Sequence, residues 1–351
     1  MRRGLIARSP DELPDGVLDA RLERVHAAMN AASLDALILY TNNTRPAGVS
    51  WLTAFVPYWS EALLLVPRQG APVLVVALTY RVKTWIERTS RVADVIHTPR
   101  IGLEAGRRVA AVKADAAVGV VELDMLSAGI AGDLAEGGPR LAITDASDVF
   151  AQVRAQPDAA EIALAKKAAS IAHLALSRIC RDGDDLGSML GAAEAAARRQ
   201  GAEEIYLAAA PDLDHDLRLR RIEGAVARGP SFAVRASVAY KGSWVRLTRT
   251  LHPDDAAARR AIDAFAGAVA QLPDARALAA FPSWLIEGCR LTQPLDAVMG
   301  SRATPPAAPL PRLVSVQARI DIDGTPVLIG APVLLGVLGQ PARLLAPPVF
   351  D

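Results

Sequence analysis

The stretch Arg235-Ala-Ser-Val-Ala-Tyr-Lys-Gly-Ser-Trp-Val-Arg-Leu-Thr-Arg-Thr250 decides the fold. Its two halves alternate between apolar or small side chains and polar ones, and a glycine lies near the middle of the connection. This pattern predicts two short strands joined by a tight turn. Because successive side chains of a strand point to opposite faces, Arg235 and Ser237 should share one face, as should Arg246 and Thr248. Arginines that line a solvated face are an alternative explanation of the pattern.

The predicted hairpin resembles the metal-binding hairpin of the creatinase, prolidase and methionine aminopeptidase family (M24), which has the pita-bread fold. Tyr240, Gly242 and the run Thr248-Arg249-Thr250 match the family pattern. The resemblance implies that Arg235 and Arg246 stand where the family's peptidases carry two aspartate ligands of a two-metal centre. A guanidinium has a permanent positive charge and no lone pair, so neither arginine is able to bind a metal ion.

A second hairpin, from Leu313 to Leu335, resembles the family's other ligand-bearing hairpin. Gln317 stands at the position of the first glutamate ligand, and Gly330 stands at the position of the second. The fifth ligand, a histidine, has no counterpart, since His252 directly follows the first hairpin. Two like charges ~4 Å apart repel by about 4 kcal/mol even with screening. The sequence therefore argues against a dinuclear hydrolase, and it predicts no metal and no cofactor.

Other residues are weaker candidates for chemistry. His215 lies among aspartates, about three residues from the position of the family's substrate-contacting histidine, and a solvated loop residue is its alternative interpretation. Tyr240 is the other candidate for proton transfer. Asp323-Gly324 is a hairpin-turn signal, which favours turn chemistry over metal binding for that aspartate.

The rest of the sequence predicts two domains. Upstream of residue 150, buried apolar runs such as Leu34–Tyr40 alternate with helical patterns, which predicts a three-layer α/β domain and resembles the family's N-terminal domain. The stretch Trp51–Val56 is predicted to be a short connector. Residues 151–351 are predicted to form a shortened pita-bread domain, α+β with a curved antiparallel sheet. A long helix from Ala160 to Cys180 should open it.

Composition narrows the functional classes. The 351 residues are 51% apolar with a net charge of +1, which gives no electrostatic argument for binding nucleic acid or an anionic membrane. No apolar run reaches the length of a membrane span, and the N-terminus lacks the features of a signal peptide. Two widely separated cysteines fit a reducing environment, so we expect a cytoplasmic protein.

Two functional hypotheses remain. In the first, the protein is a pseudoenzyme that acts as a binding protein or as the silent subunit beside an active relative. In the second, it is a metal-independent, creatinase-like hydrolase, in which Arg235, Arg246 and Gln317 hold a small anionic substrate while Tyr240 or His215 transfers a proton. No glutamate is evident at the aligned pocket positions, which weakens the second hypothesis. The family resemblance also implies a homodimer, or a heterodimer with a catalytic paralogue.

Overall fold

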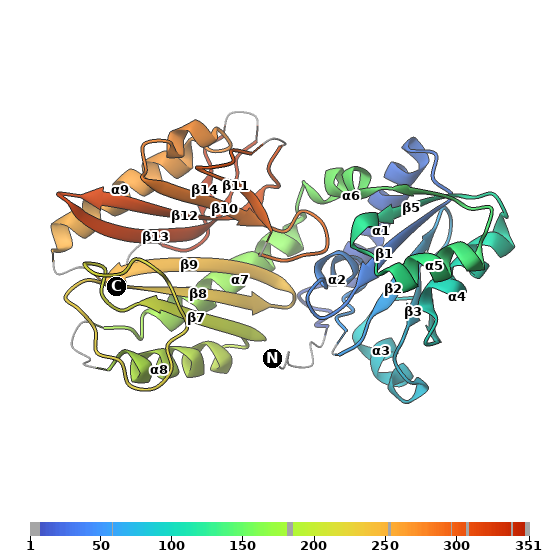
Figure 1. Cartoon of the computed structure of the whole chain (residues 1–351), viewed down its shortest axis with the longest axis horizontal. Coiled ribbons are helices and arrows are strands. Elements are labelled where there is room, and N and C mark those ends of the chain that lie inside the picture. The colour runs from blue at the N-terminus through green and yellow to red at the C-terminus, as the bar shows by residue number, and fades with distance from the viewer. Residues whose placement is uncertain are drawn as a thin grey trace. The chain divides into compact units, whose positions relative to one another are not determined.

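The computed structural model of the chain has two compact units (Figure 1). The first contains Met1–Gln156 together with Arg290–Pro294, and the second contains Pro157–Cys289 and Leu295–Asp351. The predicted boundary at residue 150 falls inside a helix, and the short segment that joins the first unit was not predicted. The structure describes residues 8–57, 59–180, 185–251, 254–295, 297–306, 309–337 and 340–347.

A six-stranded sheet forms the middle layer of the first unit, with the strand order β4-β3-β2-β1-β5-β6. β2 runs antiparallel to both of its neighbours, whereas the other adjacent strands are parallel. The strands are β1 (Ala36–Thr41), β2 (Ala62–Pro67), β3 (Val73–Val76), β4 (Asp94–His97), β5 (Ala117–Val121) and β6 (Ala142–Asp145).

Helices cover both faces of this sheet, because alternate residues of its central strands are buried on opposite sides. Leu37 and Leu39 of β1 belong to one apolar cluster, and Ala36 and Ile38 belong to the other. The first cluster includes residues of α1 (Asp15–Ala31), α2 (Ala47–Thr53), α3 (Lys83–Thr89) and α6 (Ser147–Arg154). The second includes residues of α4 (Ile101–Val112) and α5 (Ala128–Gly137). The predicted three-layer α/β domain is confirmed.

The helix α2 corrects one prediction, since part of it was expected to be a connector. Val49, Trp51 and Leu52 are all buried. A seven-residue helix that is buried on most sides shows no clear amphipathic period, so the sequence carries little helical signal.

An eight-stranded antiparallel sheet forms the second unit, which confirms the predicted α+β class (Figure 1). Its main order is β11-β10-β12-β13-β9-β8-β7, and β14 also pairs with β13. The strands are β7 (Glu204–Ala210), β8 (Phe232–Tyr240), β9 (Ser243–Leu251), β10 (Ser283–Gly288), β11 (Val298–Ser301), β12 (Leu313–Ile322), β13 (Thr325–Leu334) and β14 (Arg343–Leu344).

One face of this sheet packs against α7 (Ala159–Leu176), α8 (Leu186–Arg199) and α9 (Asp255–Ala270), which together form a single core cluster. Each helix begins at an aspartate whose carboxylate accepts hydrogen bonds from the first turn, for example Asp158 from the Glu161 amide. β10 and β11 lie in the stretch from residue 273 to 311, for which we predicted no strands. None of the helices in the described ranges is long and apolar enough to cross a membrane.

Candidate functional site

The β8–β9 hairpin has two chemically different faces. Its helix side carries buried apolar residues such as Val238 and Leu247. Lys241 and Gly242 form its two-residue turn with φ of 47° and 76°, the positive values that a tight hairpin turn requires. We call the other side, with the polar side chains that neighbouring strands add to it, the pocket face. It comprises Arg235, Ser237, Arg246, Thr248, Glu287, Ser315 and Gln317.

Arg246 makes a buried ion pair with Glu287 of β10 on the pocket face. The two side chains are 11% and 4% exposed. The Arg246 Nε donates to the Ser237 hydroxyl at 2.9 Å, and its backbone N–H donates to the Ser315 hydroxyl at 3.0 Å. The guanidinium is therefore held by groups from two other strands, and a carboxylate of the protein itself compensates its charge.

Gln317 of β12 lies directly opposite Gly330 of β13. Its Oε1 accepts a hydrogen bond from the Thr248 hydroxyl, and its Nε2 donates to the Arg246 carbonyl at 3.5 Å. A Cβ added to Gly330 would come within 2.1 Å of the Gln317 Oε1. The amide of Gln317 therefore fills the space into which a side chain at position 330 would extend.

Arg235 is half-buried and lies opposite Ala208 of β7 and Thr248 of β9. Since Arg246 lies opposite Ser237, the two arginines are diagonal neighbours on the pocket face, with an expected separation of about 7–8 Å. The structure thus brings Arg235, Arg246 and Gln317 to one surface. Their role in binding a substrate stays a prediction.

The two candidates for proton transfer lie elsewhere. The side chain of His215 is 83% exposed, and its Nδ1 lies 2.9 Å from a carboxylate oxygen of Asp212. Tyr240 lies on the helix side of β8, where it packs against the core cluster and Gly201. Its ring and the Arg235 side chain therefore leave the strand on opposite faces. His252 lies outside the described residues.

Glu287 adds to the pocket face a carboxylate that none of the aligned positions carries. The residue lies 41 positions from Arg246 in the sequence, in a strand that we did not predict. The sequence did contain a signal for this contact, namely an acidic residue inside the alternating run Ser283–Gly288. A carboxylate buried in a strand requires a cationic or hydrogen-bonding partner, so this glutamate predicts a contact with such a group.

A further carboxylate, that of Glu203, supports the hairpin turn. Its Oε2 accepts a hydrogen bond from the Gly242 amide at 3.1 Å, and its Oε1 is buried without a hydrogen-bond partner. Burial raises the pKa of Glu203 to about 7.

The residues that the resemblance places at metal-ligand positions do not fit a metal ion. Arg235 and Arg246 are cationic, Gln317 offers one neutral oxygen that Thr248 already occupies, and Gly330 has no side chain. Within the described ranges, no group of three or more His, Cys, Asp and Glu side chains is arranged to hold a metal. Chemistry that requires a dinuclear metal centre therefore has no support from these residues.

Comparisons with known proteins agree with this architecture. The family model for the Creatinase/Prolidase N-terminal domain matches residues 21–156. A comparison with curated protein sequences gave no significant match. Among solved structures, the prolidase from Pyrococcus furiosus matches with a TM-score of 0.66 and 16% identity over 92% of this chain and 98% of its own.

Two other solved structures extend the range of similar proteins. The X-Pro aminopeptidase from Thermotoga maritima matches with a TM-score of 0.72 and 16% identity, over 93% of this chain and 97% of its own. The N-terminal domain of FACT complex subunit SPT16 from Cicer arietinum (chickpea) matches with a TM-score of 0.63 and 11% identity, over 96% of this chain and 97% of its own.

The fold and the matched N-terminal domain define the class of protein: a two-domain protein with the pita-bread architecture of prolidases. Residues 21–156 are thus similar in sequence to the Creatinase/Prolidase N-terminal domain, and the whole chain is similar in fold to prolidases and X-Pro aminopeptidases.

Proposed function

We propose that this protein is a non-peptidase member of its family, and that it acts as a binding protein or as the silent subunit of a complex. The observation that carries the proposal is that polar groups of the pocket face bond to one another. Arg246 pairs with Glu287, and Gln317 pairs with Thr248. On this proposal, the positions that the resemblance assigns to metal ligands are occupied by side chains that bond within the chain itself.

A metal ion or substrate that binds to the pocket face would have to displace the Arg246–Glu287 ion pair. Separating a buried ion pair by removing one partner costs about 3–5 kcal/mol, because a buried charge is left uncompensated. A ligand that recruits Arg246 must first offset the loss of Glu287. The pocket face is therefore better suited to hold the two hairpins and β10 together than to exchange ligands.

The similar structures support a role in an assembly as well. One of them is a subunit of a complex, so this fold is also found outside proteins named as peptidases. On this proposal the protein is a cytoplasmic homodimer or the inactive half of a heterodimer with a catalytic paralogue, and its binding surface lies outside the pocket face.

A metal-independent hydrolase is the second candidate, and one observation favours it. Glu287 supplies a buried carboxylate beside Arg246. Such a group can serve as the general acid or base that the sequence alone did not provide for a hydrolase. The Arg246–Glu287 bond counts against it, because Arg246 would have to leave Glu287 to bind an anionic substrate.

Hydrolysis assays separate the two candidates. We expect no release of proline from X-Pro dipeptides, with or without added Mn²⁺, and no hydrolysis of creatine, while a prolidase assayed in parallel is active. Native mass spectrometry of the protein isolated from its source cell should show a second copy or another chain. Turnover that disappears in Glu287→Gln would establish the second candidate instead, and turnover that requires Mn²⁺ would refute both.

A further inference from the structure

The first unit has a topological switch point between β1 and β5. These two strands are parallel neighbours, and the chain leaves them in opposite directions. α2, which follows β1, packs on one face of the sheet, whereas α5, which follows β5, packs on the other. Open α/β sheets bind their ligands beyond the carboxyl ends of the strands at such a point.

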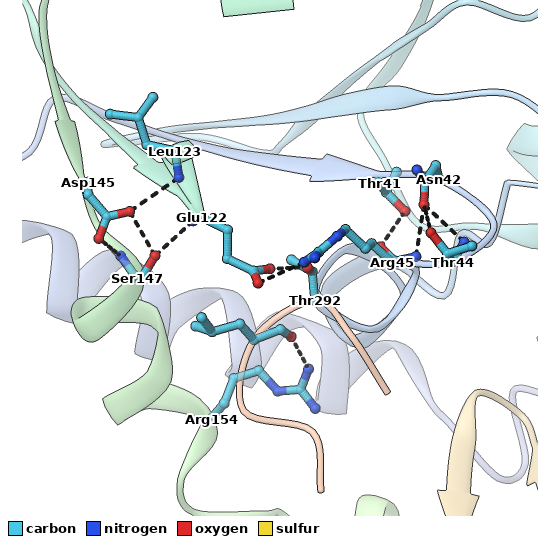
Figure 2. Close-up of polar contacts among 11 residues, drawn as sticks. Thr41, Asn42, Thr44, Arg45, Glu122, Leu123, Asp145, Ser147, Arg154 and Thr292 are labelled. Atoms are coloured by element: carbon cyan, nitrogen blue, oxygen red, sulfur yellow. Dashed lines mark hydrogen bonds and ion pairs between the residues drawn. The ribbon is translucent and has the colours of Figure 1, made fainter. Parts of the chain in front are cut away.

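Polar side chains are gathered at this switch point (Figure 2). Arg45, which follows β1, and Glu122, which follows β5, form an ion pair at 2.8 Å in which each side chain is 17% exposed. Glu122 has a φ of 54°, a left-handed conformation that a residue other than glycine rarely adopts. The Ser147 hydroxyl accepts from its backbone N–H at 2.8 Å, which fixes this conformation.

A distant segment of the chain occupies the switch point. Thr292, which is 2% exposed, donates its hydroxyl to the second carboxylate oxygen of Glu122 (Figure 2). Its backbone carbonyl accepts a hydrogen bond from the Ala47 amide at 2.8 Å. The Arg154 guanidinium donates to the Leu291 carbonyl at 3.1 Å. The Arg290 guanidinium pairs with the Asp148 carboxylate of α6 at 2.9 Å. The segment is thus bound through two side chains and two backbone carbonyls, as an extended peptide ligand is bound.

The segment Arg290–Pro294 is covalently continuous with β10, so its docking affects the end of that strand. Arg290–Pro294 connects β10 to β11 and begins three residues after Glu287, the partner of Arg246. We propose that Arg290–Pro294 is a latch, an intramolecular peptide ligand of the switch point that docks and releases as a local unit. Docking fixes the end of β10, and release frees it.

The latch has no helix or strand of its own. Its contacts include those of Arg290 with Asp148, of Leu291 with Arg154 and of Thr292 with Glu122, and no strand ladder is among them. Segments outside a strand ladder open at lower free energy than the sheets that flank them. The inference goes beyond the proposed function and does not depend on it.

Cys289 offers a direct reporter, since it is half-buried and immediately precedes the latch. In a Cys180→Ser background it is the single thiol of the chain. We expect slow modification of Cys289 by a maleimide under native conditions. Thr292→Val keeps the shape of the side chain but removes the hydroxyl, and it should accelerate the modification about tenfold, the factor that ~1.4 kcal/mol of lost docking energy produces.

Matched variants make the test specific. Thr292→Ser keeps the hydroxyl and should react at nearly the parent rate, whereas Glu122→Gln should react as fast as Thr292→Val. Thr304→Val makes the same substitution at an exposed site and should leave the rate unchanged. The latch is refuted if Cys289 of the parent reacts as fast as it does in urea. It is equally refuted if Thr292→Val and Thr304→Val give the same modification rate. A thermal unfolding temperature that falls in proportion to the faster modification also refutes it, because the thiol would then be exposed by global unfolding and not by local release.

Discussion

Each unit of this protein buries an arginine–glutamate pair, and the two pairs differ in what they enclose. Arg246 and Glu287 in the second unit are 11% and 4% exposed and are surrounded by side chains of the same sheet. Arg45 and Glu122 in the first unit are each 17% exposed, and their carboxylate also binds a threonine that is 170 residues away in sequence. On the pocket face, strand residues occupy the space around the ion pair. At the switch point between β1 and β5, the latch occupies that space, and on our proposal the latch can undock.

The difference shows how one kind of ion pair serves two purposes. The pair Arg246–Glu287 links β9 to β10 within one sheet. A pair at the carboxyl ends of parallel strands instead receives a ligand, here a part of the chain itself.

The largest effect is expected for Arg246→Met, which leaves Glu287 buried without its cation and should destabilise the second unit by about 3–5 kcal/mol. Arg45→Met should cost less, about 2 kcal/mol, because Glu122 keeps the Thr292 hydroxyl. Equilibrium urea unfolding measures both. Arg319→Met removes an exposed pair with Asp321 and should change stability by less than about 0.5 kcal/mol.

The double variant Arg246→Met/Glu287→Leu sharpens this prediction. It removes both charges and should recover most of the lost stability, because an apolar pair of similar volume carries no desolvation cost. Equal costs for the single and double variants would mean that the pair does not organise the pocket face.

A buried carboxylate without an arginine should behave differently, and Glu203 provides that case. Burial raises its pKa from 4.5 to about 7, so the fold favours the neutral carboxyl. The resulting stability is fully present below pH ~4.5 and is lost as the pH rises through about 7. Glu203→Gln fixes a neutral side chain and should be more stable than the parent at pH 8.5, by up to about 3 kcal/mol, with a much smaller difference at pH 4.5.

Thermal unfolding from pH 4.5 to 8.5 tests the Glu203 prediction. Glu223→Gln, at a side chain that is 77% exposed, is the matched control and should show no pH-dependent gain. A constant difference between Glu203→Gln and the parent at all pH values would contradict the assignment of Glu203 as the titrating group.

A smaller effect is expected where Gln317 fills the space beside Gly330. Gly330→Ala forces the amide away from Thr248 and should cost about 1–2 kcal/mol. In a Gln317→Ala background the same change should cost almost nothing, because the obstructing amide is gone. Additive costs in urea unfolding would show that the two positions do not compete for one space.

The sequence predicted the fold well because the fold depends on local patterns. The turn at Lys241-Gly242 and the alternation on each side of it define the hairpin, and the buried runs define the first sheet. The content of both sites was less predictable. Glu287 meets Arg246 across 41 residues and Thr292 meets Glu122 across 170, and no local periodicity encodes either contact. Helix α2 was missed because it is short and buried on most sides, which leaves no amphipathic period.

The pocket face carries one carboxylate, that of Glu287, which is paired with Arg246, and its other side chains are cationic or neutral, so we expect it to bind no metal ion. Elemental analysis of the protein after dialysis against Mn²⁺, Co²⁺ or Zn²⁺ tests this most directly, with a prolidase treated in the same way as the positive control. We predict no stoichiometric metal in this protein and no change in its unfolding temperature. A bound ion in stoichiometric amount, lost in a Gln317→Ala variant, would contradict the account.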